Sequence, residues 1–295
     1  MLRDDIPSES GRGTAVAFAT YGMWGLLPLY WKQLHEVDPL QIICHRVVWA
    51  LLFAFLVLAA RGRLGALAAI YRDRRRRGAA IAGGILIAAN WGIYIWAVNA
   101  GFIAESALGY YINPLLSIAL GALFFKESFD SFTAWAVAIA AVGVAAASIM
   151  MGVPPWISLV LALTFALYGA VKKKAGFDPV EGLAAETLAV APLALAYLAA
   201  EHLAGRGALG GPGLKPNLML VLSGVVTAIP LLCFGYASNR ITLQRMGFVQ
   251  YLSPSIQLVL GLVVYGEKLT PPLAVAFASV IAAAALYATT RRRAG

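Results

Sequence analysis

The chain has 295 residues, of which 61% are hydrophobic and 13% are charged, and its mean hydropathy is +0.78. A soluble domain carries about 25% charged residues and about 45–50% apolar ones, so this composition excludes a water-soluble protein. The net charge of +9 invites comparison with nucleic-acid-binding proteins. The basic residues, however, lie in short runs with no globular domain to organise them, so we expect no nucleic-acid partner.

Long apolar runs predict an all-α integral membrane protein. A helix needs roughly 20 apolar residues to cross the hydrocarbon core. The runs are continuous, whereas a transmembrane β-barrel would alternate apolar and polar residues. Residues 1–12 are polar and contain Pro7, and we expect a disordered cytoplasmic tail there. Ten transmembrane helices are predicted, at about 13–32, 38–60, 79–99, 104–125, 131–151, 154–171, 179–200, 217–237, 244–265 and 271–290.

Lys and Arg residues concentrate on one side of these predicted helices. If the amino terminus is inside, the cytoplasmic segments include the arginine-rich stretch 61–77, the lysines at 172–174 and the arginines at 291–293. The outside segments hold Lys32, Arg206, Lys215 and Lys268. Positive residues favour the cytoplasmic side, so both termini are predicted to be cytoplasmic. The Arg72–Arg77 run is expected to set this topology and to contact anionic lipid.

The first two predicted helices carry three candidate site residues. Trp24 lies deep in the first helix between Gly22 and Gly25, and it is either a packing residue or part of a cavity wall. Arg46, in the second helix, costs roughly 2.5–3.5 kcal/mol on insertion scales if it lies near the bilayer centre. It is therefore either half of an ion-paired clamp between helices or a contact for an anionic substrate. His45 is either a site residue or a hydrogen-bonded packing residue.

Polar residues also mark the third and fourth predicted helices. Asn90 and Tyr94 are four residues apart and share one face of a helix. Along the fourth helix, small and polar residues recur every four positions, from Glu105 through Asn113 to Gly121. Lipid cannot satisfy such a face, so it must contact protein or water. We expect both helices to border a central cavity.

The second half of the chain repeats the first at an offset of 140 residues. Asp38-Pro39 returns as Asp178-Pro179, and Tyr111, Pro114, Gly121 and Glu127 return as Tyr251, Pro254, Gly261 and Glu267. Each half, 13–151 and 154–290, has five predicted helices. Because five is odd, the two halves must lie upside down relative to each other in the membrane. Inverted repeats with a site at their interface are typical of secondary transporters.

The sequence lacks the motifs of several enzyme classes. It has no Gly-x-x-x-x-Gly-Lys-Ser/Thr phosphate-binding loop, no His-Glu-x-x-His and no Gly-x-Ser-x-Gly. Cys44 and Cys233 lie in different predicted helices and form neither a disulfide framework nor a metal-ligand spacing. We therefore expect no catalytic site, no cofactor and no metal.

Four stretches resemble a known family. They are His45 to Trp49, Asn90-Trp91 with Ile95 to Asn99, Glu105 to Leu115, and Gln250 to Pro254. These stretches are similar to those of the RarD branch of the EamA-type transporters, in the drug/metabolite transporter superfamily. The resemblance covers residues 14 to 290. It implies ten helices in two inverted halves, a bacterial inner-membrane location and export of a small metabolite or drug, and RarD proteins are often labelled chloramphenicol-sensitive.

The leading hypothesis is thus a secondary transporter that exports a small organic solute by alternating access. The alternative is a non-transporting membrane enzyme or a lipid-handling protein. Expected partners are the substrate and the lipid bilayer, and a homodimer is left open. Candidate substrate contacts are Trp24, His45, Arg46, Asn90, Tyr94, Tyr110, Asn113, Tyr168, Phe234, Gln250 and Tyr251, because aromatic walls with a few polar groups suit an amphipathic solute.

Two further features follow from the repeat. Pro114 and Pro254 each remove a backbone donor in mid-helix, and we predict that both kinks border the cavity. The offset also maps Arg46 onto Glu186 and Glu105 onto Arg245. It predicts two ion pairs, Arg46–Glu105 toward the outside and Glu186–Arg245 toward the inside. Pairing relieves the cost of a buried charge, and the pairs are either gates or static clamps.

Overall fold

The computed structural model describes residues 9–99, 103–127, 130–152, 156–211, 213–266 and 269–291, and within these ranges the regular structure is helical, without strands. The helices are α1 (Glu9–Trp31), η1 (Lys32–Leu34), α2 (Pro39–Ala60), α3 (Leu64–Arg72), α4 (Arg74–Asn99), α5 (Ile103–Phe125), α6 (Ser131–Met151), α7 (Trp156–Ala175), α8 (Pro179–Leu203), α9 (Leu214–Ser238), α10 (Leu243–Gln250), α11 (Leu252–Val259), the π-helical η2 (Leu260–Val264) and α12 (Pro271–Arg291).

Seven helical segments in the described part of the chain are long and apolar enough to cross a membrane. They are Pro39–Ala60, Leu108–Phe125, Ser131–Met151, Trp156–Ala175, Pro179–Leu203, Leu214–Ser238 and Leu243–Val264. Many apolar side chains on them are exposed, for example Leu123 and Leu193, at 72% and 76%. A protein that exposes this much apolar helix surface is stable in lipid rather than in water, so the predicted membrane class is confirmed. The ten-helix count stays a prediction.

The start of α2 and the start of α8 have the same local structure. The Oδ1 atom of Asp38 accepts hydrogen bonds from the backbone N–H groups of Leu40 and Gln41, and a proline follows the aspartate. Asp178 caps α8 in the same way. An N-cap carboxylate satisfies backbone donors that the first helical turn leaves free, and proline at the next position loses nothing.

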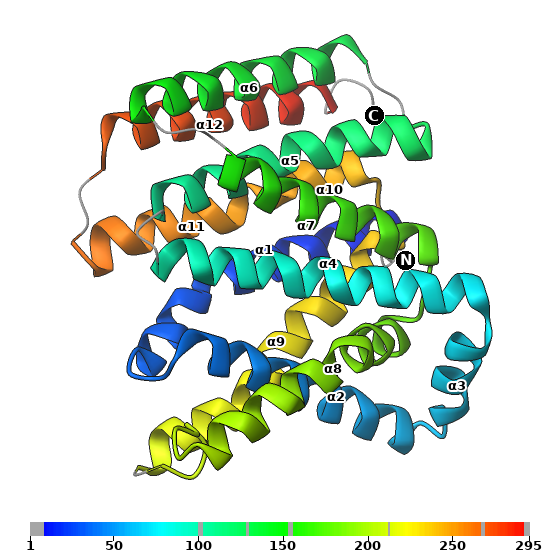
Figure 1. The fold of residues 1–295 in the computed structure, drawn as a ribbon. Helices are drawn as coiled ribbons and strands as arrows, with labels where there is room; N and C mark the ends of the chain where they lie inside the picture. Colours follow the sequence, from blue (N-terminus) through cyan, green and yellow to red (C-terminus); the bar gives the residue numbers. More distant parts are fainter. Residues whose placement is uncertain are drawn as a thin grey trace, which may run out of the picture.

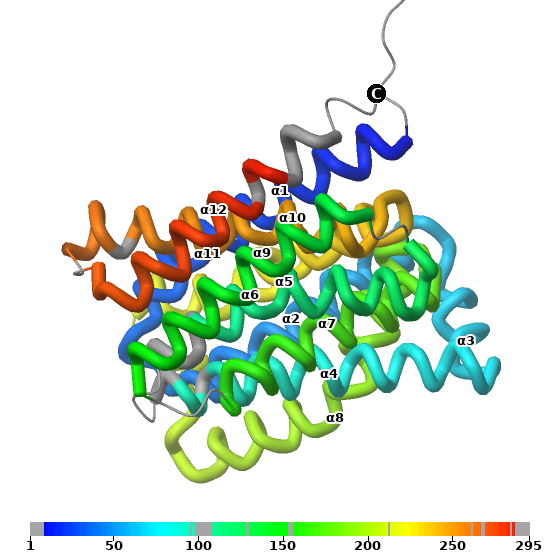
Figure 2. Tube along the Cα trace, turned by 90° about the horizontal axis from the view of Figure 1, so that it is seen from above, coloured from blue at the N-terminus to red at the C-terminus, as the bar shows by residue number. Residues whose placement is uncertain are grey.

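The helices pack mainly against helices distant in sequence. α2 lies against α8 and α9, α4 against α7 and α8, α1 against α9 and α11, and α5 between α7 and α10. α6 and α12 pack on each other and form an outer pair at one side of the bundle (Figure 1). The start of α1, the helix α3 and the end of α12 lie toward the same end of the molecule (Figure 2).

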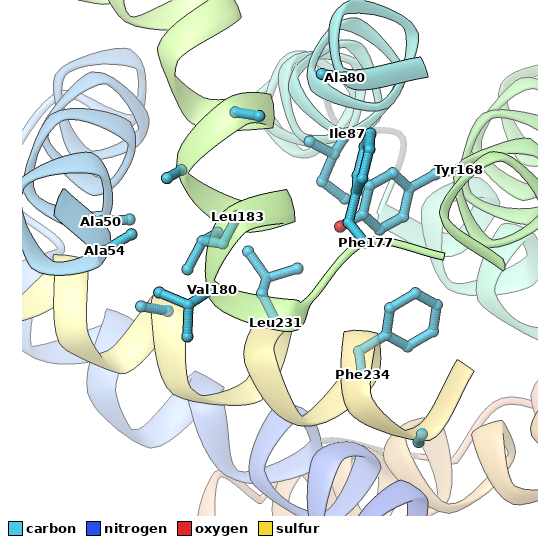
Figure 3. Packing of buried hydrophobic residues seen from close by; sticks show 14 of the residues in the cluster. Ala50, Ala54, Ala80, Ile87, Tyr168, Phe177, Val180, Leu183, Leu231 and Phe234 are labelled. Carbon is cyan, nitrogen blue, oxygen red and sulfur yellow. The ribbon is translucent and has the colours of Figure 1, made fainter. Parts of the chain in front are cut away.

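The largest buried cluster lies where α2, α4, α7, α8 and α9 meet (Figure 3). Small side chains such as Ala50, Ala54 and Ala80 let the helix backbones approach closely. At two crossings only glycine fits. A Cβ on Gly84 would collide with the backbone carbonyl of Glu186, and one on Gly224 would collide with the backbone of Trp49.

The stretch expected to be a cytoplasmic loop contains the short helix α3, which packs on α4 and α8. Its Leu67 and Ile70 are buried in the largest cluster. Beside it, Arg63 forms an ion pair with Glu181 at 2.6 Å, and Arg76 lies 3.9 Å from the same carboxylate. Two arginines of the basic stretch therefore have a structural role in docking this segment on the start of α8.

Candidate functional site

A cavity of about 150 Å³ opens between α1, α2, α4, α5, α7, α10 and α11. Engineered apolar cavities of about this size admit a benzene-sized molecule. The cavity lies toward the end of the bundle where α1 ends and α2 begins. Its lining residues are Tyr21, Trp24, Leu27, Pro28, Trp31, Arg46, Asn90, Trp91, Tyr94, Tyr110, Phe165, Gln250, Ser253, Pro254 and Gln257.

Aromatic rings form most of the wall. Trp24 contacts Tyr21 edge-on at 5.3 Å between ring centres and Phe165 at 5.7 Å. On the other side, Tyr94 and Tyr110 meet edge-on at 5.5 Å. Rings in such edge-to-face contact hold one another in place. The wall is therefore a rigid apolar surface with a few hydroxyl groups.

The wall continues inward as a stack of rings below the cavity. Phe234 lies 5.7 Å from Trp24 and stacks on Tyr168 at 5.7 Å with an interplanar angle of 14°. Both Phe234 and Tyr168 are buried (Figure 3). They support the cavity from behind and close it toward the opposite end of the bundle.

Arg46 is the charged residue among the described lining residues. Its guanidinium carbon lies 4.2 Å from the ring centre of Trp91 and 4.6 Å from that of Trp31. Its Nε donates a hydrogen bond to Thr227 Oγ1 at 2.9 Å. Cations are attracted to the faces of indole rings, so the two tryptophans and the threonine together fix the guanidinium at the cavity wall.

Three amides build the polar part of the site. Asn90 Nδ2 donates to the carbonyl oxygen of Leu161 and to Thr164 Oγ1, which ties α4 to α7. Gln250 accepts from the Tyr21 hydroxyl and donates to Asn113 Oδ1. Asn113 Nδ2 in turn donates to the carbonyl of Ala162 at 3.1 Å. This network joins α1, α5, α7 and α10 around the cavity floor.

The structure brings six of the eleven predicted substrate contacts to the cavity, namely Trp24, Arg46, Asn90, Tyr94, Tyr110 and Gln250. The other five do not line it. Asn113 lies behind Gln250, and Tyr168 and Phe234 lie behind Phe165 and Trp24. His45 is buried within α2, and Tyr251 packs with Tyr111 and Phe277. Neighbouring helices cover these side chains in this structure, and their expected role as substrate contacts stays a prediction.

Sequence reasoning missed several lining residues, above all Trp31, Trp91 and Phe165. Trp91 follows Asn90 in the chain without sharing its helix face. The spacing of the aromatic residues and proline along α1 could have identified the face of α1 that lines the cavity. Tyr21, Trp24, Pro28 and Trp31 are three or four residues apart and lie on one face.

The two prolines that were predicted to border the cavity differ in their positions. Pro254 lines the cavity, close to the break between α10 and α11, whereas Pro114 is buried inside α5 and its carbonyl packs against Gly247. The prediction that both kinks border the cavity is therefore wrong for Pro114. The tight packing of α10 on α5 leaves no space beside it.

The predicted ion pair Glu186–Arg245 is not formed. Glu186 binds Lys172, with Nζ–Oε distances of 2.7 and 2.9 Å, and accepts a third hydrogen bond from the Tyr168 hydroxyl at 3.0 Å. Arg245 instead donates to Ser10 and Thr14 of α1. The Glu105 side chain lies outside the described residues, so the pair Arg46–Glu105 stays a prediction.

At the end of the bundle away from the cavity, a carboxylate joins α5 to α10. Glu127 follows α5 and accepts hydrogen bonds from the backbone N–H groups of Leu243 and Gln244, at 2.8 and 2.9 Å. Lys173 lies 3.6 Å from the same carboxylate and donates to the Ile241 carbonyl. An acidic group at a helix amino terminus is stabilised by the free N–H groups there, so this contact ties the segment after α5 to the start of α10.

No cluster of three or more His, Cys, Asp or Glu side chains suited to a metal ion occurs in the residues that the structure describes. Cys44 and Cys233 are both free thiols. The described lining of the cavity consists mainly of aromatic rings, amides and one guanidinium.

Comparisons with known proteins agree with this description. The sequence pattern of the EamA-like transporter family matches residues 11–149 and again residues 155–289. The chain is 39% identical to Protein RarD of Streptomyces exfoliatus over 94% of its length and 88% of that protein. It is also similar to the uncharacterized transporter YojE of Bacillus subtilis, with 39% identity over 95% of this chain and 94% of that protein.

Two further comparisons add an enterobacterial relative and a solved fold. Protein RarD of Escherichia coli K12 is 34% identical over 95% of this chain and 94% of that protein. A crystal structure with 20% sequence identity superposes with a TM-score of 0.73 and covers 95% of this chain and 99% of that chain. That likeness concerns the fold alone.

Proposed function

The chain belongs to the EamA-like transporter family, as a multi-pass membrane transporter of the drug/metabolite superfamily, and we propose that it exports a small organic solute by alternating access. We place it in the bacterial inner membrane with both termini in the cytoplasm. The observation that carries the proposal is the cavity with aromatic walls between helices of both halves of the chain. A concave apolar site with a few fixed polar groups is what a small organic ligand needs.

The packing of the helices supports the proposed inverted repeat. Under the offset of 140, α1 corresponds to α7, α2 to α8, α4 to α9 and α5 to α10 with α11. Contacts between the halves then occur in exchanged pairs: α4 packs on α8 as α9 packs on α2, and α4 packs on α7 as α9 packs on α1. Such exchange is expected of two halves related by a two-fold axis in the membrane plane.

The two close glycine crossings follow the same exchange. Gly84 of α4 lies against Glu186 and Ala189 of α8, and its counterpart Gly224 of α9 lies against Trp49 of α2. Trp49 and Ala189 are themselves separated by the offset of 140. The family pattern also matches the chain twice, once in each half. These observations support five-helix units at 13–151 and 154–290.

Alternating access is supported by the difference between the two ends of the bundle. The cavity lies toward the end where α1 meets α2. At the opposite end, the stacked Phe234 and Tyr168, the Lys172–Glu186 pair and the Glu127 contact with α10 fill the space. In the proposed topology the closed end is cytoplasmic, so this conformation is open to the outside. Release of Glu127 from α10 would open the cytoplasmic end.

Transport is tested with purified protein in liposomes. A thermal-shift screen against metabolites first selects a binder, because a ligand stabilises the folded protein by mass action. We expect counterflow of that labelled binder into preloaded vesicles, and none into vesicles without protein. Chemical turnover of the binder without accumulation would instead favour a membrane enzyme.

Topology is tested with reporters. Fusions after Arg77 and after Lys174 should both report a cytoplasmic position. A periplasmic signal at one site alone would contradict the ten-helix arrangement, because four predicted helices lie between the two sites. A periplasmic signal at both would contradict the proposed orientation.

A further inference from the structure

We propose that the substrate is a small organic anion, with a carboxylate bound by Arg46 and an apolar body held between the aromatic walls. This inference rests on the proposed function and adds the chemical class of the solute. It starts from the position of the guanidinium, which is fixed at the cavity wall between Trp31 and Trp91.

The hydrogen-bonding capacity of Arg46 exceeds what its described partners use. A guanidinium has five N–H donors in a planar fork. The hydrogen bond to Thr227 uses the Nε–H, and the two indole rings lie 4.2 and 4.6 Å from the guanidinium carbon. The Nη groups are the part of the fork that matches the two oxygens of a carboxylate. The arrangement therefore keeps the bidentate edge available to a ligand in the cavity.

The described lining residues carry one positive charge, that of Arg46, and no negative charge. Among the side chains that the structure describes, no carboxylate lies within ion-pair distance of Arg46, and the described lining residues include no Asp or Glu. A charge away from water is costly unless an opposite charge accompanies it. An anionic ligand would supply that opposite charge, whereas a cationic one would add to the cost.

The walls restrict the body of this anion. Trp24, Phe165, Tyr94 and Tyr110 surround a volume of about 150 Å³, close to that of engineered cavities that bind benzene. The amides of Asn90 and Gln250 are engaged in bonds to the protein, so they leave little capacity for a highly polar body. The structure thus favours a compact monocarboxylate with a ring or a branched hydrocarbon over a sugar or a nucleotide.

The test compares acids with their neutral amides. Benzoate and phenylacetate are titrated against benzamide and phenylacetamide in detergent-purified protein, by calorimetry and by the fluorescence of the cavity tryptophans. A hydrogen-bonded charge pair contributes about 1.5–3 kcal/mol, so at least one acid should bind roughly ten-fold to a hundred-fold more tightly than its amide. Equal affinity of acid and amide, or no binding of either acid at millimolar concentration, would overturn the inference.

Variants assign the effect to Arg46. Arg46→Gln should remove the difference between acid and amide, and Arg46→Lys should keep part of it. Lys215→Gln is the control, because this lysine is exposed, bonds Gln33 and is not among the described lining residues of the cavity. Glu105→Gln addresses the predicted Arg46–Glu105 pair. If benzoate binds only after that substitution, Arg46 is already neutralised by Glu105 and the inference fails.

The experiments distinguish a failure of the anion-site inference from a failure of the transport proposal. If the acids bind in an Arg46-dependent way but labelled benzoate and phenylacetate show no counterflow, the anion site stands and the transport proposal is weakened. If a neutral solute shows counterflow while neither acid binds, the transport proposal stands and the anion site is refuted.

Discussion

Lys172 and Arg46 both lie inside the helical bundle, and their described partners differ. Lys172 and Glu186 are both 4% exposed at their side chains and are 2.7 Å apart, with the Tyr168 hydroxyl as a third partner. Arg46 contacts two indole rings and a threonine hydroxyl. The charge of Lys172 is neutralised by Glu186, whereas the charge of Arg46 lies at the cavity wall. The difference separates a residue paired within the protein from the one that we propose binds a solute.

The two sites are physically connected. Trp24 at the cavity contacts Phe234, Phe234 stacks on Tyr168, and Tyr168 donates to Glu186. A solute that displaces Trp24 would also shift Phe234 and Tyr168, which connect Trp24 to the Lys172–Glu186 pair. The comparison therefore predicts that changes at Lys172–Glu186 alter stability strongly and changes at Arg46 alter binding strongly.

The largest effect is expected from breaking the ion pair. Glu186→Gln leaves the Lys172 ammonium buried without its counter-charge, and removal of one partner of such a pair costs about 3–5 kcal/mol. We expect a much lower Tm in detergent. The double variant Lys172→Met/Glu186→Leu should recover most of the loss, because replacement of both charges by apolar groups is commonly neutral or stabilising. A Glu186→Gln protein as stable as the wild type would remove the contrast with Arg46.

A smaller loss is expected where α4 crosses the same part of α8. Gly84→Ala places a methyl group against the Glu186 carbonyl and forces the helices apart. Overpacking of this kind costs about 1–3 kcal/mol. Gly92→Ala in the same helix is the matched control, because a Cβ there meets nothing within 4 Å. Equal Tm values for the two variants would show that the crossing has room to relax.

Arg46→Met should change stability less. The variant loses the hydrogen bond to Thr227, worth about 1 kcal/mol. It also removes the cost of desolvating the guanidinium, which offsets part of that loss. We expect a Tm within a few degrees of the wild type together with loss of acid binding. A Tm loss as large as that of Glu186→Gln would mean that Arg46, too, is held by a charged partner such as Glu105.

The smallest effect on stability is expected from a solvent-exposed charged residue, Asp73. Asp73 precedes α4 and is exposed, and the backbone N–H of Arg76 donates to its Oδ1 at 2.8 Å. This hydrogen bond, with help from Arg75, lowers the pKa of the carboxyl below its ordinary value. A lowered folded-state pKa means that the stabilisation is present above the unfolded pKa of about 3.9 and is lost as pH falls through the folded value.

The measurement is Tm against pH between about pH 6 and pH 3, on either side of the ordinary Asp pKa of about 3.9. Asp73→Asn keeps an N-capping side chain without the charge. Its Tm should converge with that of the wild type at the acid end of the range. A constant Tm difference over the range would show that the charge of Asp73 contributes nothing.

Part of the site was predictable because it depends on local chemistry. Arg46, Asn90 and Gln250 are polar residues in apolar helices, and such residues seldom face lipid. The sequence did not distinguish side chains that face the cavity from side chains in the layer behind it. Asn113 and Gln250 are hydrogen-bonded to each other, yet only Gln250 lines the cavity. Periodicity identifies the inward face of a helix but not the depth of each residue.

The sequence by itself determined the membrane class, the family and the start of α2 and α8, because hydropathy and N-caps such as Asp38 and Asp178 act within one segment. Only the tertiary structure decided which intramembrane charges meet. The offset of 140 relates Glu186 to Arg46 and Arg245 to Glu105, but an offset describes equivalent positions and not distances. Glu186 finds Lys172 across the α7–α8 turn, and Arg245 faces Ser10 and Thr14 of α1. Helix packing sets those distances.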